Sequence, residues 1–525
     1  MDHLLYVTAT NNYYPTLRKN QLDIKKIGTL GELKRSGYKV LSVKDEIRKN
    51  LIERLKNREE LFNGIIGYED TVIPSIQNSL LAKHDILLLG LRGQAKTKIA
   101  RLLPELLDEY IPVVKGSEIN DDPFHPVSKY AVDMISEKGD DTEIEWIHRD
   151  RRYSEKLATP DVNIADLIGD IDPIKAANQR LHYSHEGAIH YGIIPRTNRG
   201  IFVINELPDL QPRIQVGLLN IMQEKDIQIR GFNIRIPLDL LIVFTANPED
   251  YTNRGNIITP LKDRIDSQII THYPRVLDDG IRITESQSWT DRGNGKTLNI
   301  PHYFKEIIET SAFKARESEF VDPKSGVSAR LTISSMENLI SNAERRTIIN
   351  NEDLILPRIA DLNAILPGIT GKIELVFEGE QEGANKVARS ILSKATREVF
   401  KKYFPDPLER KKKDAKPSEN VYLKIIEWFQ NGGVVKITDS MSYKEYYKEL
   451  KKVDGLESFI KKYPQYFETE YEMASLMEFI LDGLHQNSKI AKDVLEAGTT
   501  YKDMIGSMFS SGDNYDDFEE EYFKN

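Results

Sequence analysis

The chain has 525 residues, of which 40% are hydrophobic and 29% are charged, and its formal net charge is −10. This length and composition allow two to four domains with sizeable cores. The negative charge argues against a general nucleic-acid coat protein, because binding to phosphates requires a positive field. The absence of cysteine excludes disulfide frameworks and thiolate zinc sites, and it fits a cytoplasmic protein.

No part of the sequence predicts export or a membrane span. The N-terminal residues lack a basic stretch followed by a long apolar one, so we expect no secretory signal. The longest apolar runs are Ile86–Leu89, Ile201–Ile204 and Leu240–Phe244, and none approaches the roughly 20 residues that cross a bilayer. Because these runs are continuous rather than alternating, we interpret them as buried strands of a parallel sheet.

Changes of pattern along the chain predict five segments. In the second segment strands alternate with helices, which favours an α/β fold with a doubly wound parallel sheet. A later stretch rich in Pro, Lys and Asp is typical of a linker, and the acidic tail at 513–522 is typical of a solvated end. The segments are an N-terminal helical segment (1–60), the α/β core (61–275), a helical domain (276–402), the linker (403–420) and a helical C-terminal extension (421–525).

The first run of the core leads into a glycine-bearing turn and then into a helical stretch that extends to Tyr110. Such a turn predicts a phosphate site, because its backbone N–H groups and the helix N-terminus cradle an anion. We expect Lys96 to reach the β- and γ-phosphates of a nucleotide and the Thr97 hydroxyl to bind Mg²⁺. The predicted nucleotide-binding residues of this turn are Gly90, Leu91, Arg92, Gly93, Gln94, Ala95, Lys96, Thr97 and Lys98.

Ala95 departs from the usual phosphate-loop pattern, G-x-x-x-x-G-K-[ST], in which a glycine precedes the lysine. An added methyl group removes no ligand of the phosphate. We therefore expect the alanine to impose only a small steric cost.

A second polar group follows the run at 201–204. Asn205 and Glu206 stand at the predicted carboxyl end of this strand, where open α/β sheets bind ligands. We expect Glu206 to orient or activate the attacking water, and Thr97, Asn205 and Glu206 to form the metal site. An aspartate is usual where Asn205 stands. The amide brings no negative charge, so weaker magnesium affinity and slow hydrolysis are expected.

Three further residues complete the predicted catalytic set. Asn247 follows the run at 240–244, where its amide is placed to hydrogen-bond the water or the γ-phosphate. Arg264 is a candidate for the cation that a ring ATPase supplies to its neighbour's γ-phosphate. Arg330 opens a predicted helix in the helical domain and is a candidate for closing over the phosphate.

Together these motifs resemble the AAA+ ATPases, and within them the clade of MoxR-type ATPases and magnesium-chelatase I subunits. The resemblance covers about residues 60–400. Gly90–Thr97 is similar to the MoxR variant of Walker A, residues 167–200 to the stretch with the helix-2 insert, residues 216–231 to the helix and hairpin before sensor 1, and residues 115–126 to a chelatase insertion.

The resemblance implies roles for individual residues. Lys96 and Thr97 would belong to Walker A, Glu206 would be the Walker B glutamate and Asn247 sensor 1, while Arg264 would be the arginine finger and Arg330 sensor 2. Gly67 stands in the segment that lies over the adenine in the family. The implied cofactors are ATP and Mg²⁺, and the implied assembly is a homo-hexameric ring that remodels an unidentified protein substrate. A separate partner with a von Willebrand factor A domain is also implied.

Several alternatives stay open at this stage. Asn205 motivates a nucleotide-gated scaffold that binds ATP but hydrolyses little of it. An enhancer-binding-type transcriptional activator is a third reading, although residues 120–200 contain no Gly-Ala-Phe-Thr-Gly-Ala loop. The acidic balance weighs against a helicase-like motor and makes nucleic acid an unlikely partner. Metal-chelatase activity and the role of residues 421–525 are not readable from the sequence.

Overall fold

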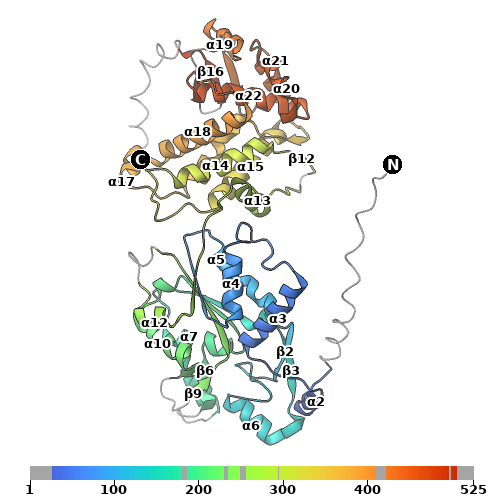
Figure 1. Ribbon diagram of the computed structural model, residues 1–525, viewed down its shortest axis with the longest axis vertical. Coiled ribbons are helices and arrows are strands. Elements are labelled where there is room, and N and C mark those ends of the chain that lie inside the picture. The colour runs from blue at the N-terminus through green and yellow to red at the C-terminus, as the bar shows by residue number, and fades with distance from the viewer. Residues whose placement is uncertain are drawn as a thin grey trace, which may run out of the picture. The chain divides into compact units, whose positions relative to one another are not determined.

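The computed structural model describes residues 26–179, 186–229, 235–248, 256–293, 295–408, 421–495 and 498–504. Internal contacts divide the chain into two compact units, Met1–His272 and Tyr273–Asn525 (Figure 1). The predicted acidic tail and most of the predicted linker lie outside the described residues. Within the described ranges no helix has the length and apolar character needed to cross a membrane. The five predicted segment boundaries stay predictions.

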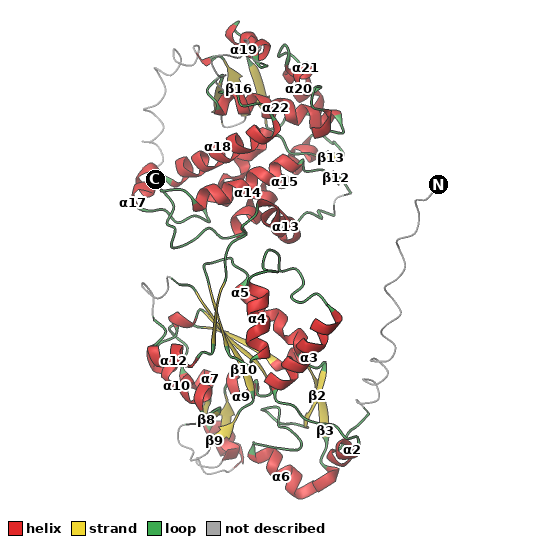
Figure 2. Cartoon of the chain, viewed as in Figure 1, coloured by secondary structure: helices red, strands yellow, loops and turns green. Residues whose placement is uncertain are grey.

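The first unit is built on a five-stranded parallel sheet (Figure 2). Its strand order is β11-β1-β10-β7-β4, so β10 lies between β1 and β7. The three apolar runs are strands of this sheet, and the predicted α/β fold with a doubly wound parallel sheet is confirmed. The strands are β1 (Ile86–Leu89), β4 (Tyr153–Leu157), β7 (Gly200–Asn205), β10 (Leu240–Ala246) and β11 (Ser267–Ile270).

Helices cover both faces of the sheet, which is why its three central strands, β1, β10 and β7, are mainly apolar. Within β1, Ile86 and Leu88 pack into one core and Leu87 into the other. The first core takes side chains from α3 (Val43–Asn57), α4 (Val72–Leu81) and α5 (Lys96–Leu102). The second core takes them from α7 (Ile164–Leu167), α9 (Ile193–Arg196), α10 (Pro212–Gln223) and α12 (Thr259–Arg264).

Two buried ion pairs attach α3 to the sheet. The Lys44 ammonium lies 2.8 Å from the Asp85 carboxylate at the start of β1. Arg152 donates to both carboxylate oxygens of Glu46, at 2.8 and 2.7 Å, and only 1% of its surface is exposed. Breaking such a pair leaves an uncompensated buried charge, which costs about 3–5 kcal/mol. The helix is therefore an integral part of the first unit's core.

Shorter elements interrupt this frame. The predicted helical run to Tyr110 is wrong beyond Leu106, since Pro104 ends α5 in a 3-10 turn and β2 begins at Tyr110. The antiparallel pairs are β2 (Tyr110–Val114) with β3 (Ile144–His148), β5 (Gly169–Ile171) with β6 (Ile189–Tyr191), and β8 (Asp226–Gln228) with β9 (Arg235–Pro237). The helices of these insertions are α2 (Leu30–Arg35), α6 (Lys129–Lys138) and α8 (Pro173–Gln179).

The second unit is mainly helical, as the sequence predicts. It contains α13 (Leu277–Gln287), α14 (His302–Arg316), α15 (Arg330–Ile349), α16 (Leu366–Thr370), α17 (Phe377–Glu382), α18 (Ala384–Tyr403), α19 (Leu423–Gln430), α20 (Tyr443–Leu450), α21 (Leu456–Ile460) and α22 (Glu470–Gln486). Two small sheets were not predicted: the pair β12 (Thr297–Leu298) and β13 (Leu354–Ile355), and the trio β14 (Val435–Thr438), β15 (Ala491–Leu495) and β16 (Gly498–Lys502).

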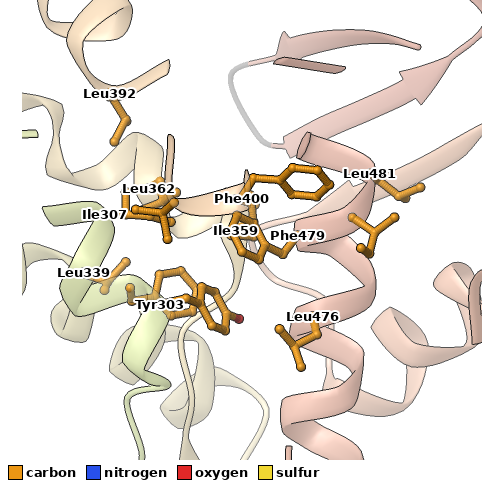
Figure 3. Close-up of a cluster of buried hydrophobic side chains, with 14 of the residues drawn as sticks. Tyr303, Ile307, Leu339, Ile359, Leu362, Leu392, Phe400, Leu476, Phe479 and Leu481 are labelled. Atoms are coloured by element: carbon orange, nitrogen blue, oxygen red, sulfur yellow. The ribbon is translucent and has the colours of Figure 1, made fainter. Parts of the chain in front are cut away.

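A single hydrophobic core joins both halves of the second unit. Figure 3 shows Tyr303, Phe400 and Phe479 meeting in this core. The rings of Tyr303 and Phe479 are stacked with centroids 4.8 Å apart, and a side chain on Gly483 would collide with Phe400. The described residues from 421 onward are thus part of the same folded body as residues 302–404.

Candidate nucleotide-binding site

The turn between β1 and α5 has the backbone geometry of an anion-binding loop. Gly93 has a φ of 74° and Ala95 a φ of 56°, both in the left-handed region. Glycine enters this region freely, whereas a residue with a Cβ pays about 1–2 kcal/mol. The expected steric cost of Ala95 therefore has a specific origin: in the left-handed region its Cβ comes close to the following carbonyl oxygen.

The hydroxyl groups of Thr271 and Tyr68 hydrogen-bond the loop at Gln94, and the sequence did not predict either residue. The Thr271 hydroxyl donates to Gln94 Oε1 at 2.7 Å, and a Cβ on Gly90 would lie only 1.9 Å from that hydroxyl. The Tyr68 hydroxyl lies 3.1 Å from the Gln94 carbonyl oxygen and 2.6 Å from that of His272. Only the position of Thr271, directly after β11, could have signalled this role. Gly90 is required because the loop passes so close to Thr271.

Lys96 is the first residue of α5, and its ammonium lies inside the turn. It donates to the Gly90 and Leu91 carbonyl oxygens, the latter at 3.0 Å, and only 6% of the residue is exposed. The cation therefore stands where the loop would wrap a phosphate group. Arg92 and Gly93 are exposed at the rim of the turn.

The segment before α4 is tied to the same helix. The Lys98 ammonium donates to the Gly64 carbonyl oxygen at 2.8 Å. Gly67 follows with a φ of 81°, in the left-handed region that favours glycine. Its neighbour Tyr68 contacts the loop, so the predicted adenine-side segment and the phosphate loop are adjacent.

Two hard oxygen atoms meet at the start of α5. The Thr97 hydroxyl lies 3.5 Å from Asn205 Oδ1, and the Thr245 hydroxyl donates to the same oxygen at 3.1 Å. Among the described residues, no group of three or more His, Cys, Asp or Glu side chains could hold a metal ion. A few protein oxygens with no acidic cage suit Mg²⁺, which keeps several waters and takes its other ligands from phosphates. The residues present therefore fit this metal.

The predicted catalytic groups Glu206 and Asn247 leave the sheet on neighbouring strands. Glu206 directly follows β7 with a φ of 54°, and its backbone N–H donates to the Thr245 hydroxyl at 3.1 Å. Asn247 directly follows β10 and is 3% exposed. Because Ile204 pairs with Phe244, the two strands end at the same level, and this edge of the sheet also faces the phosphate loop. A strained left-handed glutamate at such an edge is a feature of functional sites.

A further carboxylate belongs to this neighbourhood. Glu155 on β4 accepts hydrogen bonds from Arg101 Nε at 3.1 Å and from the Tyr153 hydroxyl at 2.8 Å. The Arg101 guanidinium is the main cause that holds the pKa of the Glu155 carboxyl below its ordinary value. The sequence reasoning did not single out this residue, since a glutamate on a short strand carries no motif.

Among the described residues, the two predicted arginines make contacts within their own units. Arg264 ends α12, and its guanidinium donates to Gln223 Oε1 at 3.1 and 2.9 Å and to the Pro260 carbonyl oxygen at 2.8 Å. Arg330 begins α15 in the second unit and is exposed, and its backbone N–H is bonded to the Ser328 hydroxyl at 3.1 Å. Their predicted roles stay proposals.

Comparison with protein families finds one match. Residues 182–270 match the model of the sigma-54 interaction domain, a stretch that includes β7, α10, β10 and β11. No curated protein sequence matches the chain.

Many solved structures are similar to parts of the chain. A candidate ATPase from Cytophaga hutchinsonii is 18% identical, with 67% of this chain and 95% of that chain covered and a TM-score of 0.27. A complex of the magnesium-chelatase subunits BchI and BchD is 20% identical, with 61% of this chain and 98% of that chain covered and a TM-score of 0.31. Hsp104 with casein is 13% identical, with 64% of this chain and 52% of that chain covered and a TM-score of 0.37. Likenesses at these TM-scores carry no argument about activity.

The family match covers three strands of the parallel sheet, β7, β10 and β11, and the strand-turn-helix loop lies in the same unit. These features agree with the AAA+ class of P-loop ATPases that the sequence predicts. Within that class, the β5–β6 pair lies between α7 and α9, and the β8–β9 pair lies between α10 and β10. Both agree with the MoxR and magnesium-chelatase clade that the sequence predicts. Arg230 and Gly231 of the predicted hairpin lie outside the described residues.

Proposed function

We propose that the chain is a Mg²⁺-dependent ATPase that works in a ring and remodels a protein partner. The observation that carries this proposal is the convergence of Lys96, Thr97, Asn205 and Glu206 at one edge of the sheet. The loop amides and the Lys96 ammonium bind the triphosphate. Magnesium would supply positive charge that offsets the negative charge of the phosphates. Thr97 and Asn205 are the protein oxygens that hold it.

Hydrolysis in this proposal rests on the chain's own polar groups. Glu206 orients the attacking water at the carboxyl end of β7. Asn247, from the neighbouring strand, hydrogen-bonds the water or the γ-phosphate. Arg264 serves the nucleotide of the next subunit, because its own contacts are with α10 and α12. Arg330 acts from the second unit as sensor 2.

Nucleotide binding is tested by calorimetry with Mg-ATP. We expect the native chain to bind and the Lys96→Ala variant to lose at least 10-fold in affinity, while Lys83→Ala, which removes an exposed ion pair with Asp45, binds like the native chain. Equal affinity for the native chain and Lys96→Ala would contradict the proposal. Turnover is tested separately with Glu206→Gln, which should bind ATP normally and hydrolyse it at least 100-fold more slowly.

A scaffold with little hydrolysis is a second candidate, favoured by Asn205. It predicts tight nucleotide binding with equal, very slow turnover in the native chain and Glu206→Gln. The sigma-54 match favours a third candidate, a transcriptional activator. Against it, the sequence has no Gly-Ala-Phe-Thr-Gly-Ala loop. ATP-dependent binding to isolated sigma-54 would support that candidate.

The partners of this ATPase also belong to the proposal. A homo-hexamer and a protein with a von Willebrand factor A domain follow from the resemblance to the MoxR and chelatase clade. Size-exclusion chromatography with light scattering, with and without Mg-ATP, tests the assembly. A mass near that of one chain under both conditions would contradict the ring. The cytoplasmic location stays an expectation from the sequence.

A further inference from the structure

The magnesium site has a charge deficit at Asn205. A neutral amide stands at the end of β7, and it can present either its oxygen or its nitrogen to the metal side. The hydroxyls of Thr97 and Thr245 both lie within hydrogen-bond distance of Asn205 Oδ1. The amide nitrogen therefore points the other way and needs an acceptor.

Glu155 is placed to be that acceptor. In the register of β4 and β7, Glu155 pairs with Val203, so its side chain lies on the same face of the sheet as Val203 and Asn205. Thr245, which donates to Asn205 Oδ1, lies on β10 at the other side of β7, so the amide nitrogen is left on the side of β4, and the Asn205 amide is among the groups that lower the pKa of the Glu155 carboxyl. Arg101 on α5 and Tyr153 on β4 hold the carboxylate in place.

We propose that Glu155 is a positioning residue of the magnesium site, supplying through the Asn205 amide part of the negative charge that an aspartate would bring at position 205. The inference rests on the proposed nucleotide-binding function. An amide that donates to a carboxylate has its oxygen polarised and its orientation fixed, as ligands in other metal sites are oriented by outer carboxylates. Asn205 Oδ1 is thereby held toward Thr97 as a stronger ligand for the metal or for its bound water.

This arrangement makes a specific prediction about restoring the usual aspartate. The Asn205→Asp substitution places a second carboxylate in hydrogen-bond contact with Glu155, and two adjacent like charges oppose each other. It should not tighten magnesium binding. Combining it with Glu155→Gln exchanges the two groups, because the introduced amide can then donate to the introduced carboxylate. The double variant should bind magnesium at least as tightly as the native chain.

The experiment measures the Mg²⁺ concentration needed for half-maximal binding of a fluorescent ATP analogue, and the affinity for that analogue in EDTA. Glu155→Gln should raise the required Mg²⁺ about 10-fold, while metal-free affinity stays unchanged. Asn205→Asp should give no gain, and the double variant should recover native affinity. Glu143→Gln, which removes a carboxylate from an exposed ion pair with Lys115, is the control and should change neither quantity.

Three outcomes overturn the inference. One is an unchanged Mg²⁺ requirement in Glu155→Gln. The second is a clear gain in Asn205→Asp alone, which remains measurable if Glu155→Gln does not fold. The third is a double variant that needs as much Mg²⁺ as Glu155→Gln alone, which would contradict the proposed exchange of the amide and the carboxylate. If the native chain binds no nucleotide with or without Mg²⁺, the proposed function fails instead.

Discussion

Ala95 shows how one residue sets the energetics of the phosphate loop. Its φ of 56° lies in the left-handed region, which glycine adopts without strain and alanine adopts only with strain. The loop nevertheless keeps this geometry because Gln94 on one side and Lys96 on the other are both tied to the surrounding backbone and side chains. Strain of this kind is common where a backbone must wrap a ligand.

Ala95→Gly should therefore stabilise the first unit by about 1 kcal/mol, since it relieves the left-handed strain. The same substitution at Ala100, buried within α5, should destabilise it by about 1 kcal/mol or more through lost helix propensity and packing. Thermal unfolding of both variants should show a higher melting temperature for Ala95→Gly and a lower one for Ala100→Gly than for the native chain. Destabilisation by both substitutions would contradict the argument.

Arg264 makes a prediction that depends on a neighbouring subunit. If it serves the next nucleotide, Arg264→Ala and Lys96→Ala are each inactive, because one lacks the cation and the other lacks bound ATP. In a mixture, an Arg264→Ala subunit with ATP can lie beside a Lys96→Ala subunit that still provides Arg264. ATPase activity should therefore reappear on mixing. Mixtures as inactive as the separate variants would argue against catalysis between subunits.

At the scale of elements, helix α22 joins the described residues from 421 onward to the rest of the second unit. Its Glu478 is 0% exposed and accepts hydrogen bonds from the backbone N–H groups of Ile359 and Ala360, both at 3.0 Å. The Tyr446 hydroxyl donates to it at 2.7 Å. The carboxyl group thus caps the 3-10 turn Ile359–Ile365 from across the core.

Burial raises the pKa of Glu478 to about 7, although Tyr446, Lys492 and Arg358 act in the opposite direction. The folded state then holds this proton more tightly than the unfolded state. The contribution to stability is full below about pH 4.5, is lost as the pH rises to about 7, and amounts to roughly 3 kcal/mol. Urea unfolding at pH 5 and pH 8 should show this loss.

Glu478→Gln cannot titrate, so the difference in stability between pH 5 and pH 8 should shrink in this variant. Glu457→Gln is the control, because ion pairs with Lys461 and Lys451 lower the pKa of Glu457. That variant should retain the native decline from pH 5 to pH 8. An identical pH dependence in the native chain and Glu478→Gln would show that Glu478 does not titrate in this range.

At the scale of the whole molecule, the chain forms two units, and residues 421–504 belong to the core of the second. Phe400 on α18 lies against Phe479 on α22, with ring centroids 5.6 Å apart, and near Tyr422. A deletion from 421 onward therefore removes part of a core. Loss of a partner after such a deletion would not identify a binding segment.

A chain ending at residue 420 should lose the cooperative unfolding of its second unit and bind a hydrophobic dye, because each large buried side chain that loses its packing costs about 3–5 kcal/mol. A chain ending at residue 504 keeps every described residue of that core and should unfold like the full chain. Calorimetry distinguishes the two. Native-like unfolding of the shorter chain would contradict the single core.

The sequence by itself determined the α/β sheet, the phosphate loop and the mainly helical second unit. These features are local: a continuous apolar run is a buried strand, and a Gly-bearing turn before Lys96-Thr97 forms within a few residues. The roles predicted for Asn247, Arg264 and Arg330 stay predictions, since a side chain's role depends on a bound nucleotide and a neighbouring subunit.

Only the tertiary structure decided the rest. It placed Thr271 and Tyr68 beneath the loop and Glu155 beside Asn205, and it joined α22 to α18 in one core. These contacts link residues far apart in the chain, so no periodicity or spacing encodes them. The backbone strain at Ala95 was equally unreadable, because φ depends on how the loop is held at both ends.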